Sequence, residues 1–276
     1  MVQRRHCGHR VPPDDLHMRT IRNLYRYPVK GLSPEPLDIV AMQARQGFPL
    51  DRELALTNGS WVYEAESYEP RPKSDFLMLM QHERLATLRT RVNAKARLLR
   101  VTSPDGEELE ASLDDEKELD VLAEFIGSHT GKALLGKPKL VHGHGKRFTD
   151  VSVVSPALMN SISLINLATV RDLARVMGTD LNPLRFRANV YFDGGSPCEE
   201  LDWLNKEIWL GQVRCRVVMR TRRCAATNVD PETGARDLGI PQALLRHYRH
   251  GDLGVYAEVL EDGQLAAGDV LVTYDD

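Results

Sequence analysis

Residues 213–220 alternate between two kinds of side chain. Successive residues of a β-strand point to opposite faces of a sheet, so this alternation predicts a strand with one buried and one largely cationic face. Ile208 and Leu210 precede Gly211-Gln212, which predicts that the strand is the second half of a hairpin. The apolar set is Val213, Cys215, Val217 and Met219, and the cationic set is Arg214, Arg216 and Arg220. Cys215 is therefore expected in the core, as a small buried hydrophobe.

Short strand patterns and turn residues recur along the rest of the chain. The turn at Ser103-Pro104-Asp105-Gly106 is one such signal. Further strands are predicted at 21–29, 54–56, 85–92, 96–101, 186–192, 255–259 and 270–272. Helices are predicted at 114–125, capped by Ser112 or Asp114, at 164–177, capped by Ser163 and closed by Gly178, and at 241–248. The pattern as a whole predicts a mostly β fold of the α+β class with a few helices.

The length of 276 residues predicts one large domain or two small ones. Residues 1–18 have no periodicity and are interpreted as a flexible tail, in which His6, Cys7 and His9 decorate a mobile end. A junction is predicted near 130–147, so that the domains span 19–140 and 141–276. His142 and His144 are interpreted as part of its glycine-rich connector rather than as a metal site.

Charge and cysteine content exclude several classes of protein. Lys and Arg number 36 against 39 Asp and Glu, a net charge of −3, so no global field would attract nucleic acid or an acidic membrane. RNA binding would also need aromatic residues among the basic ones, where only Phe186 qualifies. The charge-free run 151–170 has too many polar residues for a membrane span. The four cysteines form no C-x-x-C motif, and the start lacks a secretory signal, so a cytoplasmic protein with reduced thiols is expected.

Cys224 has a different setting from Cys215. It follows the end of the alternation and comes directly after Arg222 and Arg223. Nearby positive charge favours the thiolate, which attacks electrophiles and binds soft metals. Arg185 and Arg187 add further guanidinium groups, which suit phosphate and other planar oxyanions. A solvated strand face remains the alternative for Arg214, Arg216 and Arg220, and Asp230 is expected to hold the next loop through backbone N–H bonds.

These segments resemble a known family. Tyr27-Pro28-Val29-Lys30-Gly31 is similar to the start of the β-barrel domain that accompanies MOSC domains. The later segments are similar to the MOSC domain itself, which is named for the molybdenum cofactor sulfurase C-terminus. They are Asn166 to Leu173, Arg185 to Asn189, Arg223 to Gly234 (which contains Asp-Pro-Glu-Thr-Gly), Gly254-Val255-Tyr256 and Gly268-Asp269.

The resemblance implies an N-terminal β-barrel domain followed by a MOSC β-barrel domain with a few peripheral helices. It also implies binding of the molybdenum cofactor, a pterin dithiolene with a terminal phosphate, and it puts Cys224 in the place of the catalytic protein ligand to molybdenum. The cofactor contacts implied are Lys30, Gly31, Arg52, Asp150, Ser152, Arg187, Arg222, Arg223 and Tyr256. Relatives similar to the mitochondrial amidoxime-reducing component often have serine where this chain has Gly31, so only a backbone contact is expected there.

The function implied is a molybdenum-dependent reductase of N-hydroxylated small molecules such as amidoximes and hydroxylamines. The chain has no ferredoxin-like extension, so electrons are expected from a separate ferredoxin, cytochrome or flavin reductase. The alternative is a non-enzymatic carrier of sulfur or of the cofactor for other molybdoenzymes. Pyridoxal phosphate is not expected, since no lyase half is present, and neither are nucleic acid and membrane partners.

Overall fold

The computed structural model describes residues 18–61 and 69–273, so all but the last residue of the predicted tail lies outside the described residues. The strands are β1 (Thr20–Arg26), β2 (Glu35–Leu37), β3 (Ile39–Met42), β4 (Leu54–Leu56), β5 (Arg89–Asn93), β6 (Leu98–Thr102), β7 (Glu108–Ser112), β8 (Leu140–His142), β9 (Ile162–Asn166), β10 (Val190–Asp193), β11 (Glu207–Leu210), β12 (Val213–Arg222), β13 (Asp252–Val259), β14 (Gly263–Ala266) and β15 (Leu271–Thr273). The α-helices are α1 (Glu116–Ser128), α2 (Leu167–Met177) and α3 (Ile240–Tyr248). The fold is mostly β, as predicted.

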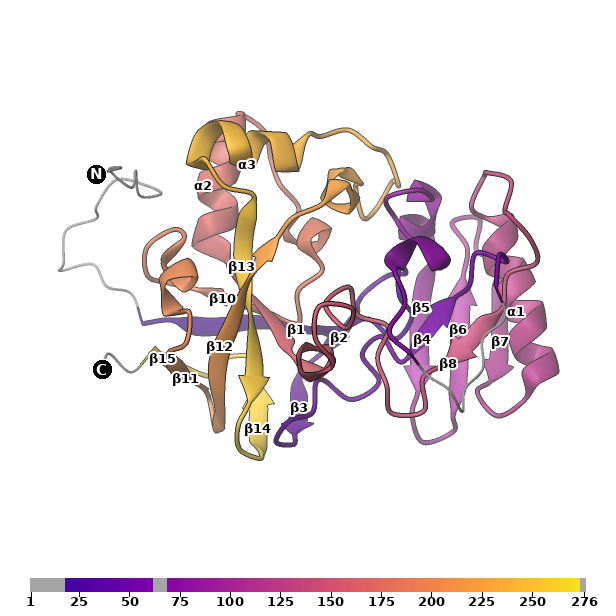
Figure 1. The fold of residues 1–276 in the computed structure, drawn as a ribbon, viewed down its shortest axis with the longest axis horizontal. Helices are drawn as coiled ribbons and strands as arrows, with labels where there is room; N and C mark the ends of the chain where they lie inside the picture. Colours follow the sequence, from indigo (N-terminus) through magenta and orange to yellow (C-terminus); the bar gives the residue numbers. More distant parts are fainter. Residues whose placement is uncertain (1–17, 62–68, 274–276) are drawn as a thin grey trace.

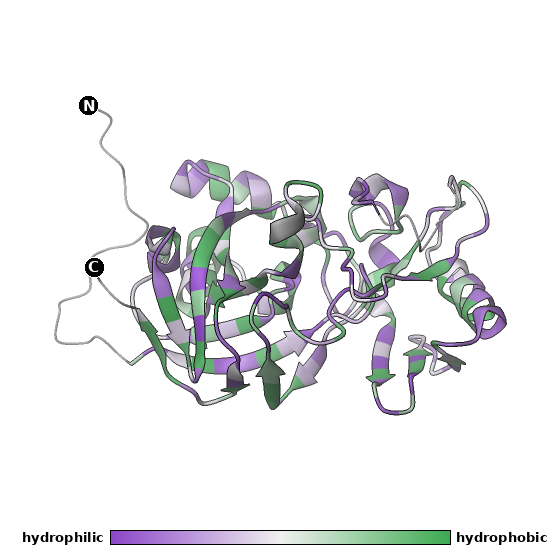
Figure 2. Ribbon diagram, turned by 60° about the horizontal axis from the view of Figure 1, so that its bottom comes forward, coloured by the Kyte–Doolittle hydropathy of each residue, from purple (hydrophilic) through white to green (hydrophobic). Residues whose placement is uncertain are grey.

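One sheet dominates the larger body, at the left of Figure 1. Its eight strands run in the order β15-β11-β12-β13-β9-β10-β1-β2, and β9 and β10 are parallel neighbours. The sheet curls around an apolar core, in which residues such as Val213, Cys215 and Val217 are fully buried. Helices α2 and α3 pack on a second apolar cluster outside the curl. Figure 2 shows hydrophobic and hydrophilic residues alternating along the strands of this sheet, as the pattern at 213–220 predicts.

The smaller body, at the right of Figure 1, has its own core. Strands β5, β6 and β7 form an antiparallel meander, and β4 pairs with β8. Helix α1 packs against β7 and β8. Asp115 caps α1 by accepting hydrogen bonds from the backbone N–H groups of Lys117 and Glu118, so the expected caps, Ser112 and Asp114, are wrong by a few residues.

The first three strands connect the two bodies. Although β1 is the first strand, it pairs with the much later β10 on one side and with β2 on the other. In the same way, β3 pairs with β14. The chain then passes into the smaller body, where β4 begins at Leu54. The residues between β1 and β4 therefore lie where the two bodies meet.

Three predicted elements differ from the observed ones. The predicted helix at 164–177 begins only at Leu167, because residues 162–166 form β9, and Asn166 rather than Ser163 is the cap. Gly178 ends this helix in the left-handed region, as expected. The predicted strand at 186–192 is the short β10, preceded by a 3₁₀ helix, η6 (Pro183–Phe186). In the region 85–92, a 3₁₀ helix, η4 (Glu83–Thr87), precedes β5.

Candidate functional site

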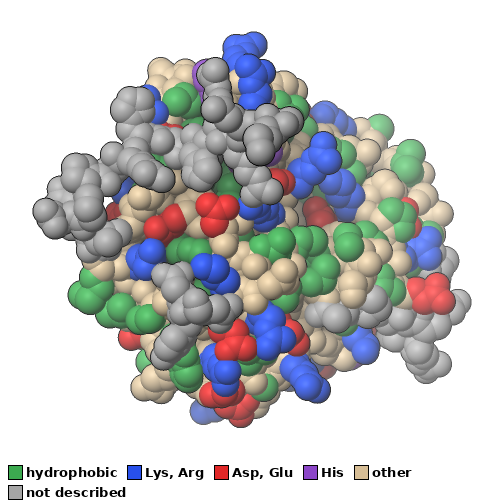
Figure 3. All heavy atoms as spheres, turned by 60° about the vertical axis from the view of Figure 1, so that its left-hand side comes forward, with side chains coloured by type: hydrophobic (Ala, Val, Ile, Leu, Met, Phe, Trp, Pro, Cys, Tyr) green, Lys and Arg blue, Asp and Glu red, His purple; other side chains and the backbone are tan. Residues whose placement is uncertain are grey.

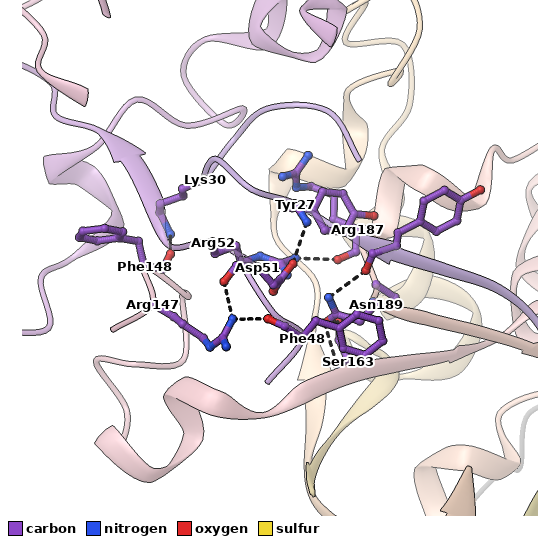
Figure 4. Close-up of polar contacts among 12 residues, drawn as sticks. Tyr27, Lys30, Phe48, Asp51, Arg52, Arg147, Phe148, Ser163, Arg187 and Asn189 are labelled. Atoms are coloured by element: carbon purple, nitrogen blue, oxygen red, sulfur yellow. Dashed lines mark hydrogen bonds and ion pairs between the residues drawn. The ribbon is translucent and has the colours of Figure 1, made fainter. Parts of the chain in front are cut away.

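Arg52 and Arg187 meet above one aromatic ring, where the two bodies join. The guanidinium carbon of Arg52 lies 4.6 Å from the centre of the Tyr27 ring, and that of Arg187 lies 4.3 Å from it. Nη2 of Arg52 donates to the carbonyl of Arg187 at 2.8 Å, and Nη1 of Arg187 donates to the carbonyl of Leu32 at 2.6 Å. These contacts, drawn in part in Figure 4, join a residue of the β1–β4 region to a residue that precedes β10.

The backbone at both arginines is in the left-handed region. φ is 53° at Arg52 and 54° at Arg187, although neither residue is glycine. Such a conformation costs about 1–2 kcal/mol for a residue with a Cβ. At Arg52 the surroundings hold it, because its N–H donates to the Tyr27 carbonyl at 2.7 Å while Asp51 accepts from the Tyr27 N–H at 2.7 Å. The fold thus maintains strained backbone at two predicted cofactor-binding residues.

Arg187 has unused hydrogen-bonding capacity. Its Nη2 is buried and has no hydrogen-bond partner among the described residues. Burial, which strips water from the cation, lowers the pKa of Arg187 to about 10, and the positive charge of Arg52 also lowers it. Arg52 differs: burial lowers its pKa, but the carboxylate of Asp51 together with Tyr27 and Tyr256 raises it overall. An anion bound at Arg187 would therefore meet a cation that lacks a carboxylate partner in the described part of the chain.

Lys30, Asp150 and Ser152 form the next part of the site. Lys30 is 8% exposed, and its ammonium donates to the carbonyl of Phe148 at 2.9 Å and pairs with Asp150. Partial loss of water raises the pKa of Asp150, but the charge of Lys30 outweighs this and lowers it overall. Ser152 is buried and donates to the carbonyl of Thr149, whose own hydroxyl is buried without a partner in the described residues.

Gly31 follows Lys30 with φ of +85°, and a Cβ there would lie 3.1 Å from the carbonyl oxygen of Leu77. The position therefore favours glycine on two grounds, backbone conformation and space. This explains locally why the chain has no serine after the lysine, and it leaves only the backbone of Gly31 to contact a ligand.

Cys224 lies where β12 ends and the 3₁₀ helix η8 (Ala225–Asn228) begins. It is a free cysteine and half-buried. Thr227 fixes the turn, since its N–H and its hydroxyl both donate to the Cys224 carbonyl, at 3.1 and 2.9 Å. Cys215 is instead fully buried, and burial raises its pKa to about 12, so the expectation that it is a core residue is confirmed.

Arg223 is held by backbone carbonyls. Its Nε donates to the carbonyl of Leu253 at 2.7 Å, its Nη2 donates to the same oxygen, and its Nη1 donates to the carbonyl of Phe186 at 2.9 Å. Burial lowers its pKa. Three of its five N–H groups therefore connect β13 with η6, and the side chain shapes the site as well as supplying charge to it.

Tyr256, on β13, connects these parts electrostatically. Burial raises the pKa of its hydroxyl, and the charges of Arg223 and Arg52 lower it. Asp150 and Cys224 also act on it, in the raising direction. Tyr256 therefore responds to the charges of groups from both bodies and from the connecting segment. The hydrogen bonds of Arg223 to Phe186 and of Arg52 to Arg187 bring three of the predicted arginines into one region.

Arg222 does not join this group. It is exposed at the end of β12, where it pairs in register with Asp252. The other arginines of β12 form surface ion pairs: Arg214 with Glu207 and Glu261, Arg216 with Glu207, and Arg220 with Asp202. Figure 3, which shows the face opposite the smaller body, has basic and acidic side chains interspersed. The alternative of a solvated strand face therefore applies to these three arginines.

The loop after Cys224 is anchored from three sides. Asp230 accepts from the N–H groups of Glu232 and Thr233, as expected, at 3.0 and 2.8 Å. Arg185, whose side chain is 3% exposed, pairs with Asp230 and Asp237, each at 2.8 Å. Arg236 reaches the smaller body, where it donates to the carbonyls of Leu79 and Met80. The sequence indicates that Arg185 could bind an anion, but in the structure its guanidinium pairs with these two carboxylates.

Sequence reasoning missed Tyr27, Asp51 and Arg147. Arg147 is 5% exposed and its Nη1 donates to the carbonyls of Phe48 and Asp51, at 2.5 and 2.8 Å, which fixes the segment that carries Arg52 (Figure 4). Tyr27 stands directly before Pro28-Val29-Lys30. Its place in that motif is the sequence feature that could have indicated its role, because its contact with Arg187 joins residues far apart in the chain.

The comparisons with known proteins agree with this arrangement. Residues 142–272 match the MOSC domain, and residues 18–133 match the MOSC N-terminal beta barrel domain. The chain belongs to the MOSC-domain family. The predicted boundaries of the two domains, 19–140 and 141–276, remain predictions, since strands of the first match pair with strands of the second.

Three relatives match this MOSC protein at low identity. Molybdenum cofactor sulfurase of Bos taurus is 24% identical over 288 residues, which cover 89% of this chain and 31% of that protein. Mitochondrial amidoxime-reducing component 1 of Mus musculus is 24% identical over 247 residues, 83% of this chain and 71% of that protein. Mitochondrial amidoxime reducing component 2 of Homo sapiens is 32% identical over 114 residues, 37% of this chain and 33% of that protein. The chain spans about a third of the sulfurase.

The residues of this MOSC protein fit a molybdenum cofactor. The unpaired Nη2 of Arg187 and the unpaired hydroxyl of Thr149 are buried donors of the kind that a phosphate or pterin oxygen satisfies. The free thiol of Cys224 is a soft ligand, which suits molybdenum. Arg52, Arg187 and Lys30 would hold the acidic end of the group, while Cys224 would hold the metal.

Two observations concern the rest of the MOSC protein. A cavity of about 330 Å³ is lined by residues of the smaller body, and none of the predicted site residues borders it: Asn58, Ser74, Asp75, Leu77, Gln81, His82, Ala133, Leu134 and Leu135. Within 18–61 and 69–273, none of the helices has the length and apolar character that crossing a membrane requires.

Proposed function

We propose that this MOSC protein binds the molybdenum cofactor and reduces N-hydroxylated small molecules, such as amidoximes and hydroxylamines. The observation that carries the proposal is that a free, half-buried Cys224 follows Arg223, which donates to the carbonyl of Phe186, the residue before Arg187 with its unpaired buried nitrogen. The likeness to amidoxime-reducing components supports the choice of substrate class. When bound, the cofactor supplies the two-electron redox chemistry.

The residues of the chain would then have separate roles. Cys224 provides the sulfur ligand, on a turn whose backbone Thr227 fixes. Arg187 and Arg52 neutralise an acidic group, and Lys30 pairs with Asp150 on the side of the connecting segment. Tyr256, whose hydroxyl responds to the charges of Cys224 and Asp150, would orient the N–OH group of a substrate. A separate electron-donor protein would deliver the electrons.

Replacing Cys224 tests the proposal directly. We expect Cys224→Ala, made in a host that synthesises the cofactor, to lose molybdenum and the reduction of benzamidoxime by an artificial donor. Cys215→Ala is the matched control, because it also removes one thiol but from the core. It should lose some stability and keep both properties. Wild-type protein without molybdenum, or a Cys224→Ala variant that reduces benzamidoxime as well as the parent, would refute the proposal.

A second candidate function is carriage of sulfur or of the cofactor to other molybdoenzymes. The match to molybdenum cofactor sulfurase over 89% of this chain favours it. Here Cys224 would hold a persulfide, or hold the cofactor only briefly. Transfer of the cofactor to an apo-enzyme without any turnover of benzamidoxime would favour carriage, whereas turnover with slow exchange of the cofactor would favour the reductase.

A further inference from the structure

Within residues 18–61 and 69–273, Tyr27 is the one aromatic side chain that both Arg52 and Arg187 contact. Its ring is fully buried, and the guanidinium carbons of Arg52 and Arg187 lie 4.6 and 4.3 Å from its centre. Its backbone is tied to the same segment, since its N–H donates to Asp51 and its carbonyl accepts from the N–H of Arg52. The residue thus contacts Arg52 through both its side chain and its backbone.

Two guanidinium groups close together and away from water repel one another, and the fold has to compensate for this. For Arg52, the carboxylate of Asp51 compensates the repulsion, with Oδ2 at 2.6 Å from Nη1 of Arg52. A second carboxylate beside Arg187 would also compensate, but it would compete with any anionic ligand. An aromatic ring attracts cations through its face without carrying a negative charge, so it stabilises a guanidinium and leaves its N–H groups free.

We propose that Tyr27 is a positioning residue for anion binding: it holds Arg187, which has no carboxylate partner among the described residues, beside Arg52, so that the two can bind an oxyanion such as the phosphate of a pterin cofactor. The identity of the ligand rests on the proposed function, whereas the placement of both arginines against Tyr27 is independent of it. The unpaired Nη2 of Arg187 is the donor that the arrangement keeps available.

The side chain of Tyr27 permits a sharp comparison. Its hydroxyl approaches that of Tyr191 without hydrogen-bond geometry, so Tyr27→Phe should keep the ring, the backbone bonds and anion binding. Tyr27→Leu removes the aromatic face and keeps an apolar side chain. Since Tyr27→Leu loses the cation–ring contacts with both guanidinium groups, we expect it to bind inorganic phosphate roughly tenfold more weakly.

A cavity control separates positioning from loss of stability. Phe192, on β10, is as deeply buried as Tyr27 but packs in the apolar core of the curled sheet, so Phe192→Leu should destabilise the protein and leave the phosphate affinity unchanged. If Tyr27→Leu does not fold, Tyr27→Met replaces it, because an unbranched side chain fills irregular space more easily.

The measurements are calorimetric titration of the cofactor-free full chain with inorganic phosphate, and the pterin content of protein made in a cofactor-competent host. Weak phosphate binding and low pterin content in Tyr27→Leu, both restored in Tyr27→Phe, support the inference. Unchanged phosphate affinity in Tyr27→Leu, equal loss in Phe192→Leu, or a wild-type chain that does not bind phosphate overturns it. A wild-type chain that binds phosphate and never contains pterin overturns the proposed function instead.

Discussion

The side chains that form the site differ in how much of their charge remains for a ligand. Arg185 forms ion pairs with Asp230 and Asp237, and Arg223 donates three N–H groups to backbone carbonyls. Arg187 has no such partner for its Nη2 among the described residues. The sequence predicted a dense group of arginines and, through the resemblance, singled out Arg187. It was not informative about which guanidinium would be left unpaired, because the carbonyls and carboxylates that decide this come from distant segments.

Replacing Arg187 should therefore weaken cofactor binding far more than replacing Arg214. Loss of one hydrogen bond to a charged group costs about 1.5–3 kcal/mol, so Arg187→Ala should lower cofactor affinity about ten- to a hundredfold. Arg214 pairs with Glu207 and Glu261 on the surface of β12, and Arg214→Ala should have little effect. The ratio of molybdenum to protein after gel filtration measures both variants. Equal retention of cofactor would show that the unpaired nitrogen of Arg187 has no role in binding.

Among the secondary-structure elements, the boundary between β9 and α2 shows what the sequence leaves ambiguous. Every residue of β9 is buried, and its sequence, Ile-Ser-Leu-Ile-Asn, has no strict alternation of apolar and polar residues, so it fits a buried helix segment equally well. Asn166 resolves the ambiguity through contacts that appear only in the fold, since its amide donates to the carbonyls of Gly194 and Ser196. The hairpin of β11 and β12 was predictable, because one buried face leaves a strict period of two.

The loop that follows Cys224 depends on Arg185, and this can be measured as stability. The side chain of Arg185 is 3% exposed, and it also donates to the carbonyl of Asn228 at 3.2 Å. Arg185→Ala should lower the free energy of unfolding by about 3 kcal/mol, the lower end for a broken buried ion pair, because its carboxylate partners are partly hydrated. Arg171→Ala breaks a surface pair with Asp193 and should cost less than about 1 kcal/mol. Urea denaturation of the two variants checks this, and similar losses in both would contradict it.

At the scale of the whole molecule, the site exists only where both bodies meet. Lys30, Arg52 and Tyr27 belong to segments that leave the curled sheet for the smaller body, whereas Arg187, Cys224 and Tyr256 belong to the sheet or its loops. The sequence order predicted two domains, but it did not predict that β1 and β3 would pair with β10 and β14. Such pairings depend on contacts between residues far apart in the chain, which local patterns do not record.

The stability of the whole fold should also depend on pH through one carboxyl group in the larger body. Glu200 is fully buried, and Thr169 donates its hydroxyl to both carboxyl oxygens at 3.0 Å. Burial raises its pKa from 4.5 to about 7, although the hydrogen bonds oppose this. Between these two values the folded protein holds a proton that the unfolded chain has released, so a rise in pH favours the unfolded chain.

We therefore expect the contribution of Glu200 to stability to fall as pH rises from about 4.5 to about 7, by up to about 3 kcal/mol, and to change little above that range. Glu83 acts in the opposite direction at lower pH, because its hydrogen bond from Lys132 lowers its pKa to about 2, so its contribution is lost as pH falls from 4.5 toward 2. Glu200→Gln should remove the decline between pH 5 and pH 8, and the exposed control Glu107→Gln should retain it. Urea midpoints at several pH values measure this, and parallel declines in wild type and Glu200→Gln would show that the proton on Glu200 does not control the stability of the fold.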